Sequence, residues 1–490
     1  MLEEAHSVRA AETSDATSAD FERGVDLVAR IQSRELSARE LMETTLARIA
    51  RVDPTLNAIP TRVDDADALA MADSADTALA KGDPVGPLHG IPIAIKDLVA
   101  TRGLRTTLGS PLLKDFVPSE DGLYVKRLRE AGALVIGKTN VPEFGAGSHT
   151  FNPIFGVTRN PHDPSKSAGG SSGGAAAALA SGMLAFADGS DMGGSLRNPA
   201  AFCGVVGFRP SLGTVPSPEP GPGFIARLTV DGAMGRSVAD AAWLLSVMAG
   251  PDPGDPMSIF APGSRFRAPL ERDFGGARVA WGGDLGLFPV DPEVLAICEG
   301  ALHGFAGIGA RVEADRPDLS GAMDVFQTQR AATFAQFERM WAGIPDWRAQ
   351  VKDTLLWNID RGLALSATDL VASDAERKRI CASAARFFET YDFLALPTTQ
   401  VPAFDVDIEW VQEINGQPMS TYIDWMASCC VITVTGLPAL SVPCGFTRAG
   451  LPVGLQIVGG PRCDFEVLQV AHAFEQAIDL PPTASAPDPG

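Results

Sequence analysis

Hydrophobic positions recur at helical spacing in the N-terminal part of the chain, beginning near Phe21. The letters SARE form a capping box, in which Ser37 caps a helix and Glu40 reaches back to its first turn. The amphipathic helix LMETTLARIARV follows. DADALAMADSADTALAKG predicts a second amphipathic helix, which ends at Gly82 and Pro84.

Short apolar runs alternate with helical patterns farther along the chain. GIPIAIKDLVA at 90–100 and ALVIGKTN at 133–140 are typical of buried strands, and the helical YVKRLREAG lies between them. The alternation returns over most of the remaining sequence. This order predicts one α/β domain over 21–480, with a large mixed, mostly parallel β-sheet covered on both faces by helices.

The two ends and two internal stretches lack this periodicity. Residues 1–20 and 481–490 are polar or rich in proline and predict a disordered N-terminal segment and a disordered tail. Residues 217–228 and 404–420 predict long loops, which serve either as lids and substrate loops or as simple connections.

Composition and charge narrow the classes of partner. The chain has 490 residues, with 40 Lys and Arg against 60 Asp and Glu, a net charge of −20. This charge disfavours nucleic acid and anionic membrane surfaces as partners. The longest apolar stretch, 175–187, is too short to cross a bilayer, and the N-terminus has no signal-peptide pattern. The seven cysteines show no CxxC spacing, which predicts free thiols in a cytoplasmic protein and no zinc site.

One stretch matches a nucleotide-binding pattern. GALVIGKT at 132–139 fits the phosphate-loop sequence GxxxxGK[ST] in full. Its four intervening residues are those of a strand, and the order here is helix and then strand, whereas a phosphate loop needs strand, loop and helix. The pattern therefore predicts no nucleotide site.

A second stretch contains the nucleophile-elbow pattern GxSxG twice. In SAGGSSGGAAAALASG the pattern centres on Ser171 and on Ser172. Such an elbow needs a histidine downstream, and the two that qualify, His303 and His472, fall in segments with helical periodicity. A glycine-serine turn that caps an alanine helix is the alternative interpretation.

A third stretch, DMGGS at 191–195, can form a nest of bare backbone amides that ends in the hydroxyl of Ser195. Acyl transfer needs a nucleophile beside such donors, and an ordinary glycine turn is the alternative. A base is also needed. Lys96 ends an apolar strand, where burial lowers the pKa of an amine, unless Lys96 merely pairs with the adjacent Asp97 or with another carboxylate at the sheet edge.

Taken together, these stretches resemble the amidase signature family. GGSSGGAAAALASGMLAFADGSDMGGSLRNPAAFCGVVGFRP at 169–210 is similar to the family's signature segment almost throughout. The family's further patterns are matched, in order, by HGIPIAIKD, GKTNVPEFG, FGVTRNPHDP, TGLPALSVPCGF and GLPVGLQIVG. The resemblance covers roughly 21–480 and implies the amidase signature fold.

The resemblance implies a Ser–Ser–Lys triad. Ser195 would be the nucleophile, Ser171 the proton relay and Lys96 the base, and a cis peptide after Gly170 would present the relay. Ser172 would be a hydrogen-bonding helper. No metal or organic cofactor is implied.

The resemblance also implies positions that hold the substrate. The oxyanion hole would use the backbone amides of Met192, Gly193, Gly194 and Ser195. The substrate-contacting positions would be Phe144, Gly145, Ser172, Ile423 and Trp425. Ser190 and Met192 stand where family members more often carry threonine.

The implied activity is hydrolysis of aryl or alkyl carboxylic amides, with ester hydrolysis as a side activity. Some family members cleave carbamates, including urethanes, which is the alternative on the same triad. The A-type component of glutamyl-tRNA amidotransferase shares the motifs, but its usual segment differs from SPEPGPGFIARL at 217–228. A small-molecule amide, carbamate or ester is the expected partner. Homodimers are common in the family, and the residues themselves indicate no oligomeric state.

Overall fold

An eight-stranded sheet forms the centre of the computed structural model, which describes residues 21–218 and 227–480. Its strand order is β10-β9-β11-β15-β14-β7-β8-β6. From one edge to the other, the strands are β10 (Arg311–Ala314), β9 (Arg278–Trp281), β11 (Phe393–Pro397), β15 (Pro452–Gly459), β14 (Ala439–Phe446), β7 (Val206–Arg209), β8 (Val230–Gly235) and β6 (Phe186–Asp191).

The sheet is mixed, as predicted, but the prediction that it is mostly parallel is wrong. β10, β9 and β11 pair in parallel, whereas the five pairings from β11 to β6 are antiparallel. The strand–helix–strand order does give β6 and β7 the same direction. A later strand, β8, then inserts between them and pairs antiparallel with both, and β15 does the same between β11 and β14.

A second, three-stranded sheet has the order β1-β3-β2. It comprises β1 (Thr61–Arg62), β3 (Leu134–Thr139) and β2 (Pro92–Lys96). β3 contains the stretch that matches the phosphate-loop pattern, and its extended backbone confirms that this stretch is strand and not an anion-binding turn. β2 packs beside β6 of the large sheet, so residues at the end of β2 lie at the seam between the two sheets.

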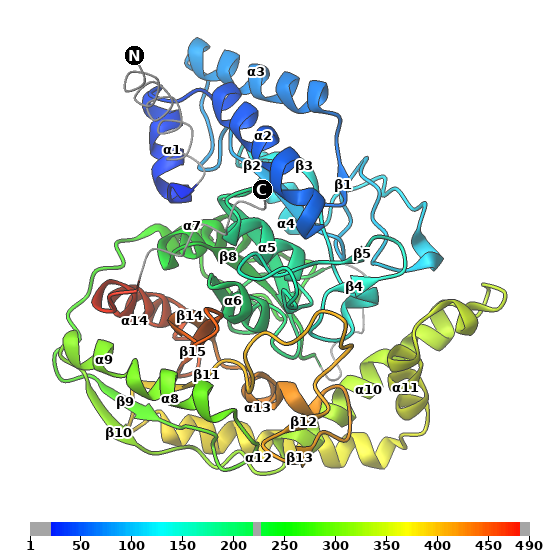
Figure 1. The fold of residues 1–490 in the computed structure, drawn as a ribbon, viewed down its shortest axis with the longest axis vertical. Helices are drawn as coiled ribbons and strands as arrows, with labels where there is room; N and C mark the ends of the chain where they lie inside the picture. The colour runs from blue at the N-terminus through cyan, green and yellow to red at the C-terminus, as the bar shows by residue number, and fades with distance from the viewer. Residues whose placement is uncertain (1–20, 219–226, 481–490) are drawn as a thin grey trace, which may run out of the picture.

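Helices surround both sheets, and Figure 1 shows α1 to α3 as a layer at one end of the molecule and the α10–α11 pair at a lower edge. The capping box of α2 is present, since Ser37 Oγ accepts from the Glu40 amide at 3.1 Å. The helices are α1 (Gly24–Ser33), α2 (Ala38–Leu56), α3 (Asp65–Lys81), α4 (Leu123–Glu130), α5 (Gly173–Ala180), α6 (Arg197–Cys203), α7 (Val238–Met248), α8 (Pro292–Gly300), α9 (His303–Gly307), α10 (Ala322–Met340), α11 (Asp353–Leu363), α12 (Ala367–Phe387), α13 (Ala427–Thr435) and α14 (Asp464–Ala477).

The alanine-rich helix α5 is buried on every side and packs against β2, β3 and β6. Small side chains are needed because backbones approach it closely. A Cβ on Gly174 would lie 2.3 Å from the Asn140 amide nitrogen and 2.6 Å from the Ala58 carbonyl oxygen. Its N-terminus, which follows Ser172, is thereby fixed against the three-stranded sheet.

The remaining predictions about organisation have mixed outcomes. The predicted disorder of 1–20 and 481–490, and the central part of the predicted loop 217–228, lie outside the described residues. The irregular region 404–420 contains a small hairpin of β12 (Glu413–Ile414) and β13 (Gln417–Pro418). All seven cysteines are free thiols. Within the described ranges, no helix has both the length and the apolar character to cross a membrane.

Candidate active site

The side chain of Lys96 lies at the centre of a buried group of hydroxyls. The alternation of β2 turns this residue inward at the end of a fully buried strand. Its Nζ lies 2.9 Å from Ser171 Oγ, 2.7 Å from Ser172 Oγ and 3.0 Å from Ser190 Oγ. These four residues are called the lysine cluster below. The two serines of the GGSSGG turn and the serine before Asp191 therefore share one amine.

Burial lowers the pKa of Lys96 to about 7. The full desolvation of the amine is the dominant cause, and the carboxylates of Asp188, Asp231 and Asp191 oppose it. The predicted alternative, an ion pair with Asp97, is absent: Asp97 instead accepts from Thr107 Oγ1 at 2.6 Å and lies 3.9 Å from Lys138 Nζ. A neutral amine is thus accessible near neutral pH beside a serine hydroxyl.

The segment that carries Ser171 is held by buried side chains. The Gly170–Ser171 peptide bond is cis, as the resemblance implies. Ser148 Oγ donates to the Gly170 carbonyl at 2.5 Å. On the other side, a Cβ on Gly145 would lie 3.4 Å from Ser171 Oγ and 2.8 Å from a Leu98 methyl carbon. Glycine at position 145, with φ of 67°, leaves room next to the relay hydroxyl.

A histidine that sequence reasoning missed supports the same segment. His149 is buried, and its Nε2 lies 3.0 Å from the Val406 carbonyl, which places the proton on Nε2. Nδ1 then accepts from Ser167 Oγ at 2.7 Å, and Ser167 Oγ accepts from the Gly169 amide at 3.0 Å. Burial lowers the pKa of His149 to about 4, so it stays neutral. No motif in the sequence distinguishes this histidine.

The turn that carries Ser195 is anchored by a buried ionic group, called the aspartate cluster below: Asp191, Arg197 and Arg209. Arg197 donates to Asp191 through Nε and Nη2, each at 2.9 Å, and Arg209 Nη1 lies 3.2 Å from Asp191 Oδ1. Burial alone would raise the pKa of Asp191, but the two guanidinium groups hold it well below its usual range. The carboxylate is therefore permanently charged.

The amides of this turn divide into two kinds. The Gly194 amide donates to Asp191 Oδ1 at 2.9 Å, so it is occupied inside the turn, contrary to its predicted place among the oxyanion donors. In the part of the chain that the structure describes, no backbone or side-chain acceptor meets the amides of Met192, Gly193 or Ser195. Ser195 is half-buried, and its carbonyl accepts from the Ser172 amide at 3.2 Å, which ties the turn to the start of α5.

A cavity of about 780 Å³ opens at the end of β6, and Ser190 is the one member of the two clusters that lines it; Ser195 does not. Ser190 and Met192 form part of its wall, and Arg227 and Asp255 form a bidentate ion pair within it. Phe116 and Met340 line it and are 46% and 58% exposed. Most of the lining is apolar and includes Leu98, Leu108, Leu113, Val215, Leu228 and Val230.

The predicted substrate-contacting residues fall into two groups. Ser172 belongs to the lysine cluster, Gly145 lies behind Ser171, and Phe144 contacts the ring of Trp341 at 4.6 Å between centroids. None of the five lines the cavity, and Ile423 and Trp425, which are 0% and 1% exposed, pack in the core. Their burial removes the geometric basis for predicting that they contact substrate.

Other candidates lie elsewhere. His303 and His472 fall on α9 and α14, as predicted, and neither belongs to the lysine cluster.

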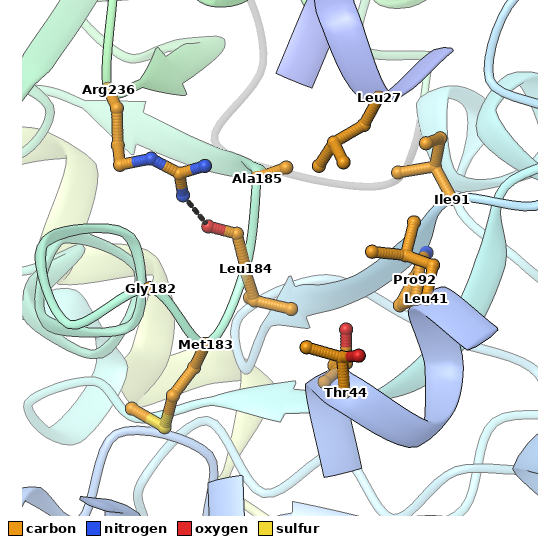
Figure 2. A pocket seen from close by; sticks show the side chains of 11 residues that line it. Leu27, Leu41, Thr44, Ile91, Pro92, Gly182, Met183, Leu184, Ala185 and Arg236 are labelled. Carbon is orange, nitrogen blue, oxygen red and sulfur yellow. Dashed lines mark hydrogen bonds between the residues drawn. The ribbon is translucent and has the colours of Figure 1, made fainter. Parts of the chain in front are cut away.

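A small cavity of about 20 Å³, which has room for roughly one water, lies between α1, α2 and the turn at 182–185. Figure 2 shows its lining, which is mostly apolar but includes Thr44 and Arg236, and the hydrogen bond from Arg236 to the Leu184 carbonyl. It contains none of the candidate site residues.

Comparison with known proteins agrees with this geometry. A family model described as Amidase matches residues 40–468. The acylamidase of Rhodococcus erythropolis is 36% identical over 465 residues, which cover 92% of this chain and 94% of the relative. The A-type component of the glutamyl-tRNA(Gln) amidotransferase of Thermosynechococcus vestitus is 36% identical over 477 residues, with coverage of 92% and 97%.

Comparison with solved structures also finds enzymes that act on amides. A bacterial aryl acylamidase of the amidase signature family superposes with a TM-score of 0.90 at 30% identity, covering 96% of this chain and 99% of that one. A 6-aminohexanoate cyclic dimer hydrolase gives 0.85 at 28% identity, with coverage of 94% and 98%. The fold and the comparisons together define a hydrolase that acts on amides. The chain belongs to the amidase signature family.

Proposed function

We propose that this chain hydrolyses linear carboxylic amides through an acyl-enzyme on Ser195, with Lys96 and Ser171 as the proton relay. One observation carries the proposal: a fully buried amine with a pKa of about 7 lies 2.9 Å from Ser171 Oγ. A lysine that is neutral near pH 7 can accept a proton from a hydroxyl, which is what a serine nucleophile needs.

The proposed reaction uses these groups in turn. Neutral Lys96 takes the proton of Ser171, which takes that of Ser195, and the Ser195 oxygen attacks the amide carbonyl carbon. The negative charge of the tetrahedral intermediate is stabilised by the unoccupied amides of Met192, Gly193 and Ser195. The proton returns through Ser171 to the leaving nitrogen as the C–N bond breaks. Water then attacks the acyl-enzyme by the same route and releases the carboxylic acid.

The cavity supports a substrate with a large apolar aryl or alkyl group. Its volume suits a drug-sized ligand, and its wall is mostly aliphatic. Two relatives named as an acylamidase and an aryl acylamidase agree with this substrate class. Phe144, Gly145 and Ser172 stay proposed contacts near the scissile bond. Esters are expected as a side activity, because alkoxide leaving groups need less protonation.

Two other activities fit the same triad. A carbamate would place its carbonyl in the same position, so urethane hydrolysis is the first alternative. The amidotransferase components among the relatives make the role of an A-type component of glutamyl-tRNA amidotransferase the second alternative, for which glutamine serves as the test substrate. A cytoplasmic location and a homodimer stay predictions.

The testing experiment is a panel of p-nitroanilides, p-nitrophenyl carbamates and glutamine, assayed with the wild type and with Ser195→Ala. We expect anilide turnover that falls at least about 10³-fold in the variant. Ser74→Ala, an exposed serine on α3, is the matched control and should retain full activity. Turnover that survives in Ser195→Ala contradicts the assigned nucleophile. Activity restricted to carbamates or glutamine selects the corresponding alternative.

A further inference from the structure

Arg330 on α10 is a buried cation without a counterion. It is 5% exposed, and among the residues that the structure describes no carboxylate forms an ion pair with it. Nη2 donates to the Tyr422 hydroxyl at 2.6 Å, and Nη1 lies 3.2 Å from the sulfur of Met192. Nε has no hydrogen-bond partner. A thioether is a weak acceptor, so much of the hydrogen-bonding capacity of this guanidinium is unused.

The surroundings of Arg330 stabilise its charge without neutralising it. Its guanidinium carbon lies 4.3 Å from the ring centroid of Phe334 and 5.6 Å from that of Tyr422. Cation–π contacts of this kind keep the positive charge in place. Nearby, Lys352 is a second cation, and the carboxylates of Glu143 and Glu409 act on Lys352. Neither carboxylate forms an ion pair with Arg330.

This arrangement contrasts with the arginines of the aspartate cluster, which share one carboxylate. A buried charge left unpaired costs stability, so its retention calls for another role. The neighbour of Arg330 identifies that role, since Met192 belongs to the turn that would hold the oxyanion. α10 also packs directly against this turn: a Cβ on Gly193 would lie 3.0 Å from the ring of Phe326, which is on α10.

We propose that Arg330 is a positioning residue that acts through Met192: it holds the side chain of this residue and supplies positive potential where negative charge develops during amide attack. The proposal rests on the proposed acyl-enzyme mechanism. In the transition state, negative charge develops on the substrate oxygen beside the Met192 turn, and this charge is the counter-charge that Arg330 lacks in the resting enzyme. The unpaired cation therefore lowers the stability of the resting enzyme and stabilises the transition state.

The test compares Arg330→Met, Arg330→Lys and the wild type on one neutral p-nitroanilide. We expect kcat to fall about 10- to 100-fold in Arg330→Met with KM within about threefold, since the charge acts on the transition state and not on the neutral substrate. Arg330→Lys keeps the charge and should recover most of kcat. The control is Arg127→Met on α4, which removes a part-buried cation that donates to the carbonyls of Met248, Gly250 and Pro251 and contacts neither residues 190–195 nor the cavity wall.

A second readout is the affinity for phenylboronic acid, which becomes a tetrahedral anion when a serine oxygen adds to boron. Arg330→Met should weaken this inhibitor by a factor similar to its loss in kcat, and Arg127→Met should not. Thermal unfolding of Arg330→Met should occur at the wild-type temperature or above it, because the variant loses an unpaired charge and leaves Tyr422 with Asn358 as a partner.

Two results would overturn the proposal. One is a lower melting temperature with unchanged kcat and unchanged boronate affinity, which assigns Arg330 a structural role. The other is an effect confined to KM for an anilide that carries a carboxylate, which makes Arg330 a substrate-binding residue. Failure of the acyl-enzyme mechanism is recognised separately, by turnover that survives in Ser195→Ala.

Discussion

Lys96 and Asp191, the central residues of the lysine cluster and the aspartate cluster, are both fully buried. The two clusters meet at the end of β6, where Asp191 follows the partly exposed Ser190. In the aspartate cluster, the carboxylate lies within hydrogen-bond distance of two guanidinium groups, and its charge is fixed. In the lysine cluster, the amine is surrounded by neutral hydroxyls, and its nearest carboxylates act only at a distance.

The comparison teaches that equal burial gives opposite protonation behaviour when the nearest partners differ. A paired charge in the interior maintains the shape of the Ser195 turn, because breaking the pair would leave a charge without compensation. An amine surrounded by hydroxyls can be either charged or neutral near pH 7, which suits a group that must accept and release a proton. The following variants test this difference between the two clusters.

Replacement of the base should have the largest effect on activity. Lys96→Met is expected to reduce kcat/KM at least about 10³-fold on a p-nitroanilide, because no other amine lies in the lysine cluster. Its melting temperature should stay equal or rise, since a desolvated amine is removed. Lys138→Met is the matched variant: it leaves Asp97 buried without its cation and should melt lower. A Lys96→Met protein with substantial turnover would contradict the assignment of the base.

Loss of the central carboxylate should act mainly on stability. Asp191→Asn leaves Arg197 and Arg209 uncompensated, so the free energy of unfolding should fall by about 3–5 kcal/mol in urea titrations. Activity should fall as well, because the Gly194 amide loses its carboxylate acceptor and the turn loosens. An Asp191→Asn protein as stable as the wild type would show that the cluster does not anchor the turn.

The pH dependence of the wild type should report the lysine. The base works when deprotonated, so kcat/KM should rise with pH up to an apparent pKa of about 7 and then level off. Below that value the expected slope is about tenfold per pH unit. Asp231→Asn should move the profile to lower pH, because this carboxylate raises the pKa of Lys96. A profile that is flat between pH 5 and 9 would exclude Lys96 as the titrating base.

Removal of a single hydroxyl from the lysine cluster should reduce activity less than removal of the amine. Ser190→Ala removes the contact at 3.0 Å to Lys96 Nζ but keeps the Ser190 carbonyl at 3.3 Å. We expect kcat/KM to fall by about two- to tenfold, in line with the loss of one hydrogen bond to a neutral amine. A loss as large as that of Lys96→Met would mean that Ser190, and not Ser171, carries the proton.

The smallest effect is expected from the two downstream histidines. His303→Ala and His472→Ala lie on α9 and α14, outside both clusters, and each should retain activity within about twofold in the same anilide assay. A large loss in either variant would revive the histidine-dependent interpretation of the GxSxG pattern.

Local sequence patterns predicted the helices and strands of this fold well, but they did not predict how strands from distant segments pair. The capping box at Ser37 and the strand character of 134–139 follow from neighbouring residues and are confirmed. The insertion of β8 and β15 as antiparallel strands depends on contacts between distant segments, which periodicity does not encode. The mostly parallel prediction failed for that reason.

The same division holds within the candidate site. Lys96, Ser171 and Ser172 stand in motifs that the sequence makes visible, and the structure brings them within 3 Å. Arg330 and His149 carry no motif, because their significance arises from what surrounds them in three dimensions. Gly194 was misassigned because the sequence does not reveal that its amide is already bound by Asp191.

The anchoring of Arg197 has a consequence for the order in which the protein is made. The proposed base, relay and nucleophile all lie within the first 195 residues of a 490-residue chain. Arg197 nevertheless donates to Thr433 at 3.0 Å and to Gln456, which belong to α13 and β15. A ribosome that has synthesised every proposed catalytic residue has therefore not yet supplied the groups that fix the Ser195 turn. We therefore expect the enzyme to become competent only when its C-terminal strands emerge, and truncation before β15 to abolish turnover although no proposed catalytic residue is missing.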